Sequence, residues 1–323
     1  MFFCHAFMSV IIFASFYLSY RALQTLKKRN MFGMSTKILL QSSIIHGVVH
    51  QAIAASIRFQ ALYRAIRYFH DPCSIQFTSS SCVLEGIFYY HTNLFCSVVC
   101  LSLFLDCLAS TYINKFYKSV PKKAAYTYIV LQILIPFLVL DWVFSDATYT
   151  GYVPICNYPP KNSGDNFFYV NTTRIYILWI IAVASIVHFY MSFKHEKRIV
   201  HEKCDTNTRF NAFENLLSAR AVCLIICIQA ICLGGTSAIP SIFNIYRGPI
   251  PVAWFHGTIA FATGLTFANF FVPIIITFET NRIIKRRRSR IQALFRQTNA
   301  FDYHHDLKNR MESSYKKTYP KTT

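Results

Sequence analysis

Charged residues are scarce in this chain, and acidic residues are the scarcest of them. Lys and Arg number 33 while Asp and Glu number 14, and together they make up 15% of the 323 residues. Hydrophobic residues account for 54%, which leaves little sequence for a large soluble domain. The composition therefore favours an integral membrane protein over a soluble enzyme.

The common catalytic motifs are also missing. The sequence contains no phosphate-binding Walker loop, no HExxH and no GxSxG. His46 and His50 are four residues apart and share a helix face, as in the metal-binding histidine boxes of membrane hydroxylases, but the other boxes of those enzymes are absent. We expect the two histidines to hydrogen-bond within a helix bundle instead, and we expect no enzymatic activity, no cofactor and no metal site.

Seven long apolar runs are the dominant feature that the sequence does contain. They cover approximately residues 3–22, 38–60, 84–112, 124–144, 173–193, 219–243 and 252–278. A helix of ~20 apolar residues spans the bilayer core and satisfies its own backbone hydrogen bonds there. The sequence thus predicts an all-α membrane protein, a seven-transmembrane helix bundle over residues 1–282, followed by a basic cytoplasmic tail over 283–323.

Basic residues lie on alternate sides of these runs. If the runs cross a membrane, 27 of the 33 Lys and Arg residues fall on one side. Positive residues stay cytoplasmic during insertion, so we expect the N-terminus outside and the C-terminus inside. The first run has no charged segment before it and no small-residue cleavage site after it, so we expect a retained anchor rather than a signal peptide. Because the basic residues flank the runs, membrane lipids are expected partners and nucleic acid is not.

Two further absences limit the function of a seven-helix protein. The last run has no lysine, which excludes a retinal Schiff base there. A transporter or channel is the alternative to a receptor, but it should have broken spans with paired acidic residues at mid-membrane, and this chain has almost none.

Four cysteines fall on or near the predicted outer side, where disulfides persist. They are Cys4, Cys73, Cys82 and Cys156. We predict a disulfide between Cys82 and Cys156, with Cys73 as a competing partner for either. Asn171 begins an Asn-Thr-Thr glycosylation pattern, but it lies so close to the next span that a transferase would have difficulty reaching it.

Polar groups inside membrane spans are costly, so they indicate functional positions. Those in the outer halves of the second, third, sixth and seventh predicted spans are candidates for lining a ligand pocket between these spans: His50, Tyr89, Tyr90, His91, Asn93, Gln229 and His256. The outer side carries few basic residues, so we expect a neutral or weakly charged small molecule as ligand.

The predicted inner side offers candidates for activation. Asp106 ends the third span, and we expect it to form a breakable ion pair with Arg209 or Arg220. The apolar spacing in residues 210–217 predicts a helix that extends the sixth span inward and carries Glu214. Pro240 and Pro273 are expected hinge positions near the ends of the last two spans.

Several short motifs, in this order, resemble one known family. They are Ser35–Leu40 followed by His46 and His50, Asp71-Pro72-Cys73 followed by Cys82, Asp106–Tyr112, Lys115–Ser119 and Arg209–Leu216. Together they look like the nematode serpentine receptors of the class alpha, alpha-beta and beta group, with class alpha or alpha-beta the closer match. The resemblance extends from about residue 10 to about residue 290.

This resemblance implies a G-protein-coupled chemosensory receptor that binds a small external chemical and activates a heterotrimeric G protein. It further implies the plasma membrane, and specifically the ciliary membrane of sensory neurons, as the location. The chain departs from the family pattern at Cys107, which stands where the family usually has an arginine. It also has a very short outer N-terminus, so the pocket should be formed by the spans.

Overall fold

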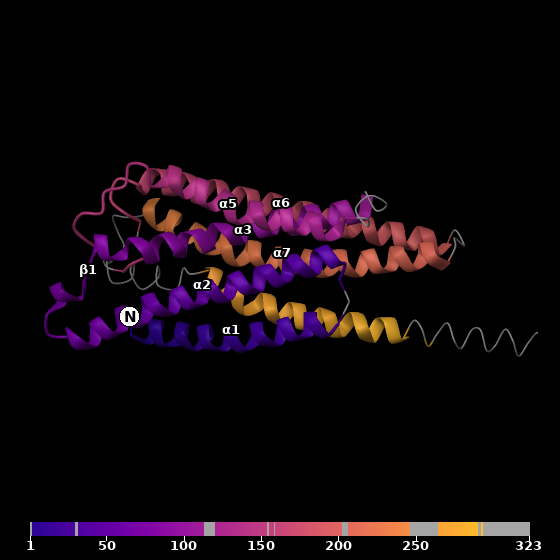
Figure 1. Ribbon diagram of the computed structural model, residues 1–323, viewed down its shortest axis with the longest axis horizontal. Helices are drawn as coiled ribbons and strands as arrows, with labels where there is room; N and C mark the ends of the chain where they lie inside the picture. Colours follow the sequence, from indigo (N-terminus) through magenta and orange to yellow (C-terminus); the bar gives the residue numbers. More distant parts are fainter. Residues whose placement is uncertain are drawn as a thin grey trace, which may run out of the picture. The chain divides into compact units, whose positions relative to one another are not determined.

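The structure is a computed structural model that describes residues 2–29, 32–112, 120–153, 155–157, 159–201, 206–245, 264–289 and 292. The chain divides into two units, Met1–Thr277 and Phe278–Thr323, and each is considered by itself. Helices make up most of the described residues in both units (Figure 1).

Seven helices in the described part of the chain are long and apolar enough to cross a membrane. Six carry the labels α1 (Phe2–Lys28), α2 (Met34–Arg67), α3 (Val83–Tyr112), α5 (Pro121–Val143), α6 (Gly164–His201) and α7 (Thr206–Ile245). The last is the helix Gly264–Ser289, which begins in the first unit and ends in the second. The predicted seven-helix fold is therefore confirmed.

The helices extend further than the apolar runs. α6 begins at Gly164 and α7 at Thr206, whereas the corresponding runs begin near residues 173 and 219. A helix can continue into polar sequence because its backbone hydrogen bonds do not depend on apolar side chains. The helix expected over residues 210–217 is confirmed as part of α7. The predicted start of the last run, at residue 252, lies outside the described residues.

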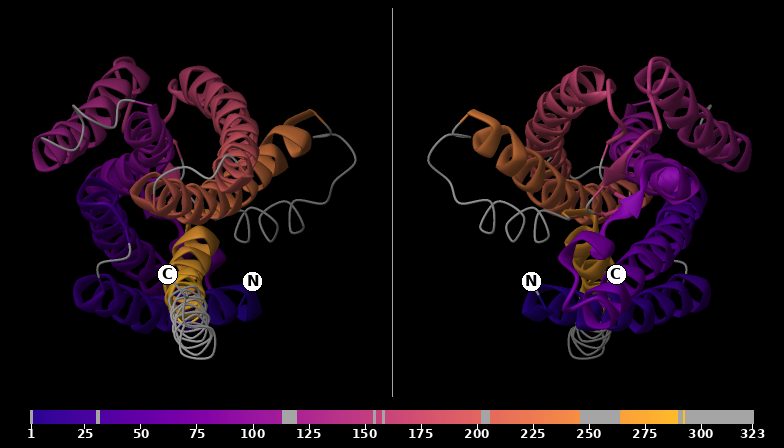
Figure 2. Two further views of the ribbon diagram at one scale, coloured as in Figure 1. Left: turned by 90° about the vertical axis from the view of Figure 1, so that its right-hand side faces the viewer. Right: turned by 90° about the vertical axis from the view of Figure 1, so that its left-hand side faces the viewer.

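Within the first unit, α3 is the helix with the most neighbours. It packs against α2, α5, α6 and α7, and the end-on views show it among them (Figure 2). Its side chains Phe95, Val99 and Leu103 are almost fully buried, and they lie at the four-residue spacing that forms one helix face. A change along α3 can therefore reach four other helices.

The last helix joins this packing through its first half. Asn269 donates a hydrogen bond to the carbonyl of Gly47 on α2, and Gln51 donates one to the carbonyl of Thr266 at 3.1 Å. A β-carbon at Gly47 would lie 2.8 Å from Oδ1 of Asn269, so the absent side chain permits this close approach.

A small β-structure joins two of the connecting segments. Strand β1 (Phe77–Thr78) pairs antiparallel with β2 (Tyr152–Val153), with Phe77 opposite Val153. Short 3₁₀ helices, Pro72–Ile75 and Ser79–Cys82, precede and follow β1. The sequence analysis did not predict these strands, since a two-residue strand contains too little periodicity to detect.

The second unit is described only over residues 278–289 and 292. It contains the C-terminal part of the last helix, where Arg282 pairs with Glu279 at 3.5 Å, one helical turn away. Helical structure thus continues past residue 278, where the apolar run ends, into the basic sequence that follows.

Candidate ligand pocket and helix contacts

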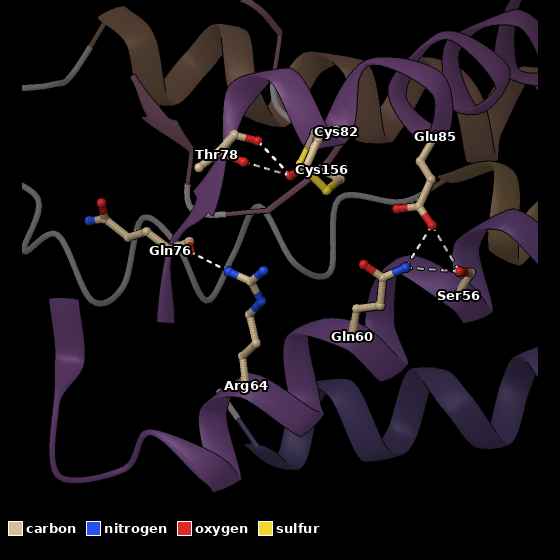
Figure 3. Close-up of a disulfide and its surroundings, with 9 residues drawn as sticks. Ser56, Gln60, Arg64, Gln76, Thr78, Cys82, Glu85 and Cys156 are labelled. Carbon is tan, nitrogen blue, oxygen red and sulfur yellow. Dashed lines mark hydrogen bonds between the residues drawn. A yellow bond between two sulfur atoms is a disulfide. The ribbon is translucent and has the colours of Figure 1, made fainter. Parts of the chain in front are cut away.

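A disulfide joins the N-terminal end of α3 to the segment between α5 and α6. It links Cys82 to Cys156, the pair named first in the sequence analysis, across 74 residues of chain (Figure 3). The segment approaches α3 so closely that a β-carbon at Gly86 would lie 3.2 Å from the carbonyl oxygen of Cys156. The disulfide and the β1–β2 pair therefore fix this segment over the end of α3. The side chain of Cys73, the competing partner, lies outside the described part.

Polar contacts tie α2 to the same end of α3. Glu85 accepts hydrogen bonds from Ser56 at 2.9 Å and from Gln60 at 2.7 Å (Figure 3). Arg64, one turn beyond Gln60, lies 4.0 Å over the ring of Phe77 in β1, a cation–π distance. Because Glu85 is engaged in this way, its role is the attachment of α2 to α3.

Tyr90 of α3 contacts the segment between α5 and α6 that the disulfide links to α3. Its hydroxyl donates a hydrogen bond of 2.6 Å to the carbonyl of Asn157, and its ring contacts Phe144 and Phe167. The side chain is nearly buried. It therefore connects α3, the end of α5, α6 and the segment between them.

Two cavities meet at Tyr90. The first has about 300 Å³ of empty space, partly open, and lies between the disulfide, the N-terminal turns of α3 and the end of α5. The second has about 350 Å³, also partly open, between α3, α5 and α6. Its lining residues are Tyr90, Asn93, Leu94, Leu140, Val143, Phe167, Val170, Asn171 and Arg174. Both figures include space that is open to solvent, and the cavity volumes themselves are about 20 Å³ and 30 Å³, room for one or two water molecules each. A larger ligand therefore requires the surrounding side chains to move.

Arg174 supplies the charge in the second cavity. Its guanidinium donates hydrogen bonds to Asn93 on α3 and, at 2.7 Å, to Asn171 one turn earlier on α6. The other lining residues besides Tyr90 are apolar. This arrangement, an apolar space with a few convergent polar groups, is typical of sites that orient a small molecule.

Two of the predicted pocket residues form contacts between helices. His50 of α2 is fully buried, and its Nδ1 lies 2.7 Å from the hydroxyl of Thr92 on α3. Its ring also contacts the ring of Tyr89, a buried residue of α3. His46 stacks on Phe95 with ring centroids 3.5 Å apart. His50 thus hydrogen-bonds to another helix of the bundle, as expected, whereas His46 hydrogen-bonds to Ser42 of its own helix and contacts α3 through its ring.

His91 and Gln229 also hold helices together. His91 lies 3.3 Å from the carbonyl of Ile133, and its ring contacts the tilted ring of Phe137, both on α5. Gln229 of α7 accepts a hydrogen bond from the thiol of Cys100 and donates one to the sulfur of Cys96, both on α3. The last candidate, His256, lies outside the described residues. Of the seven pocket candidates, Tyr90 and Asn93 line the described cavities.

Asp106 is held near the C-terminal end of α3 with no exposed surface. The hydroxyl of Thr36, at the start of α2, donates a hydrogen bond of 2.6 Å to its Oδ2. Thr36 is a partner that the sequence analysis missed, since it considered only basic side chains. The ion pair with Arg209 or Arg220 stays a prediction.

The other activation candidates lie on α3, on α7 and on the last helix. Cys107 is buried next to Asp106, and Glu214 and Arg220 are half-buried on α7. Arg209, also on α7, has a buried Nε that has no hydrogen-bond partner among the described residues. The two expected hinge prolines are inside continuous helices: α7 continues past Pro240, and the last helix continues past Pro273, which is buried.

Asn171, the possible glycosylation site, is half-buried in the third turn of α6. Its Oδ1 accepts the hydrogen bond from Arg174, and the buried hydroxyl of Thr172 beside it has no hydrogen-bond partner in the described part of the chain. This environment favours a structural role for Asn171, and its glycosylation remains untested.

The sequence analysis missed Arg174 as a site residue, although a signal was present. Arg174 is the only residue among Asp, Glu, Lys and Arg in the fifth apolar run, and charged groups in a membrane span mark functional positions. It was counted only as one of the few basic residues on the outer side. The apolar run began at residue 173, whereas α6 begins at Gly164, so Arg174 lies well inside the helix rather than at its end.

Comparison with known proteins gives a consistent result over nearly the whole chain. Residues 2–311 match the family model for the serpentine type 7TM GPCR chemoreceptor Sra. Three relatives from Caenorhabditis elegans are serpentine receptor class alpha-29 (42% identity, covering 93% of this chain and 87% of the relative), class alpha-31 (44%, 90% and 85%) and class alpha-28 (41%, 95% and 90%).

Proposed function

The chain belongs to the Sra family of serpentine seven-transmembrane chemoreceptors, and from this membership we propose that it binds a small external chemical and activates an intracellular G protein. The seven apolar helices make it a multi-pass membrane protein. We further propose that it acts in the plasma membrane of a sensory neuron, at the cilium, with its N-terminus outside. The relatives named as class alpha receptors favour class alpha over alpha-beta.

The cavity between α3, α5 and α6 is the observation that supports ligand binding best. It lies next to Tyr90, which contacts the disulfide-linked segment, and its lining combines apolar side chains with Asn93, Asn171 and Arg174. We therefore assign the pocket to this side of α3. The sequence analysis had favoured the side facing α2, α7 and the last helix.

A signal from this pocket has a direct route along α3. Cys96 and Cys100 lie one and two turns beyond Asn93 and contact Gln229 of α7, and Asp106 follows with its contact to α2. A ligand activates only if it binds the active arrangement of these helices more tightly than the resting one. We propose that ligand contacts at Tyr90 and Asn93 change the position of α3 and that the inner ends of α2 and α7 respond.

Expression in cells with a G-protein reporter tests this proposal. The cells would be screened with a library of small volatile and water-soluble chemicals, and surface expression would be measured by an outer tag. We expect at least one chemical to give a dose-dependent signal that cells without the receptor lack. A correctly inserted receptor that gives no signal with any coexpressed G protein, across the library, would argue against the proposed function.

Once a ligand is known, substitutions separate pocket residues from packing residues. Tyr90→Ala and Asn93→Ala should weaken its potency at least about tenfold, as expected for the loss of a contact worth ~1.4 kcal/mol. His91→Ala is the matched control, because His91 contacts α5 rather than either described cavity. A larger loss of potency for His91→Ala than for the other two, at equal surface expression, would move the pocket elsewhere.

A further inference from the structure

The cavity between α3, α5 and α6 contains an arginine that belongs to a helix long and apolar enough to cross a membrane. Arg174 lies ten residues after the start of α6, which is about 15 Å along the helix, and Asn93 lies ten residues into α3. Charged side chains in membrane-spanning helices face the interior of a bundle or a polar cavity. Arg174 does so here, since it is one of the residues that line the cavity.

The neighbours of Arg174 hold its guanidinium in place. Asn93 and Asn171 each present a side-chain oxygen to a different terminal nitrogen of the group. These bonds come from two helices, α3 and α6, so the orientation of the guanidinium is fixed from both sides. A fixed guanidinium is well suited to bind a carboxylate, because its planar arrangement of donors matches the two oxygens.

The rest of the lining determines what the remainder of a ligand must be. Among the described residues that line the cavity there is no Asp or Glu, so this part of the wall has no carboxylate that would repel a bound anion. Leu94, Leu140, Val143, Phe167 and Val170 provide an apolar surface beside the charge. An apolar body of modest size would lie against this surface once the lining side chains move apart to admit it, and a single acidic group would contact Arg174.

We propose that the cavity binds an amphipathic small molecule with one carboxylate, held by Arg174 and oriented by Asn93. This inference rests on the proposed function, because it names the chemical class of the receptor's ligand. The sequence analysis expected a neutral or weakly charged ligand, and this proposal specifies a ligand with a single negative charge. The acid binds as its anion, and its apolar part lies against Phe167 and the α5 side chains.

Binding is tested on the purified full-length receptor in lipid nanodiscs, by thermal stabilisation with matched acids and amides. The probes are octanoate against octanamide and phenylacetate against phenylacetamide, which differ in charge but little in shape. We expect at least one acid to stabilise the receptor at a concentration about tenfold lower than its amide. Equal effects of acid and amide, or no effect of either acid, would overturn the proposal.

Substitutions at the cavity test whether Arg174 is responsible. Arg174→Gln should raise the concentration of acid required about tenfold or more, while Arg174→Lys should retain part of the affinity because it keeps the charge but not the two parallel donors. Asn93→Asp keeps Arg174 but places a carboxylate beside it, so it should also weaken acid binding. If Arg174→Gln fails to fold, Asn93→Asp decides the question, and acid affinity unchanged in that variant would overturn the proposal.

Two outcomes separate this inference from the proposed function. If acids stabilise the receptor but no chemical elicits a G-protein signal, the site stands and the signalling function fails. If neutral chemicals signal and acids do not bind, the function stands and the assignment of ligand class is wrong. Stabilisation by anionic lipid in the nanodisc, lost in Arg174→Gln and not competed by the acids, would also overturn it by assigning the site to a lipid.

Discussion

Asp106 and Thr36 form the contact at residue scale with the clearest consequence for signalling. Asp106 has no exposed surface and Thr36 is 5% exposed, so water cannot replace the hydrogen bond between them. Leaving a buried carboxylate without one of its donors costs about 1–3 kcal/mol. A cost of this size, if borne by the resting state alone, would change the ratio of resting to active receptor by about fivefold to 150-fold.

We therefore predict that Thr36→Val raises ligand-independent signalling, whereas Thr36→Ser, which keeps the hydroxyl, leaves it near the wild-type level. Asp106→Asn should raise it as well, because the neutral amide holds the donor less strongly. Basal G-protein signal, normalised to surface expression, is the measurement. A normally expressed Thr36→Val receptor with an unchanged basal signal would show that this contact does not hold the resting state.

The sequence identified Asp106 but could not identify Thr36. A carboxylate after three apolar residues is evident from the chain alone, because such a group is costly in a membrane. Its partner, Thr36, lies 70 residues earlier in the sequence on another helix, and nothing in the sequence distinguishes this threonine from the others. Contacts between helices depend on how the helices are rotated, and the spacing of residues within one helix does not specify that rotation.

At the scale of secondary-structure elements, the disulfide holds a segment that has little other structure. The two strands have two residues each, and Gly151 before β2 has a φ of +87°, a conformation that favours glycine. The described residues of this segment are also held by a bridge between Thr148 and Lys161 and by the hydrogen bond from Tyr90 to Asn157, and the Cys82–Cys156 bond adds a covalent link that typically contributes about 2–4 kcal/mol.

We predict that Cys82→Ser and Cys156→Ser each reduce surface expression, and that the double mutant loses no more than either single mutant. Flow cytometry on an outer epitope tag measures this, and Cys73→Ser is the matched control for loss of a nearby cysteine. Losses that add in the double mutant would indicate that the two cysteines have different partners in the cell.

The contact of α2 with the last helix leads to a second prediction at this scale. Gly47→Ala would place a methyl group 2.8 Å from Oδ1 of Asn269 and 3.1 Å from its Cγ. Overpacking of this kind typically costs about 1–3 kcal/mol, so the thermal stability of the purified receptor should fall. Adding Asn269→Ala removes the atoms in conflict and should restore part of the loss, and a double mutant less stable than Gly47→Ala would contradict the proposed cause.

For the whole molecule, hydropathy was sufficient to predict the fold because the bilayer imposes it. Each span must be a helix of minimum length, and seven apolar runs gave seven helices. The location of the described cavities could not be obtained in this way. The polar residues of the outer half of α3 point to several sides, and only the structure distinguishes Tyr90 and Asn93, which line cavities, from His91, which contacts α5.

The orientation of the bundle in the membrane follows from charge and is the last prediction. With 27 of 33 Lys and Arg residues on one side, we expect the N-terminus outside and the C-terminus inside. Epitope tags before residue 1, after residue 323 and beside Lys161, an exposed residue between α5 and α6, would be tested with antibody before and after permeabilisation. The first and third should be accessible in intact cells and the second only after permeabilisation. An accessible C-terminal tag in intact cells would mean that the chain crosses the membrane an even number of times or in the opposite orientation. The cavity between α3, α5 and α6 could then not receive an external chemical in the way proposed.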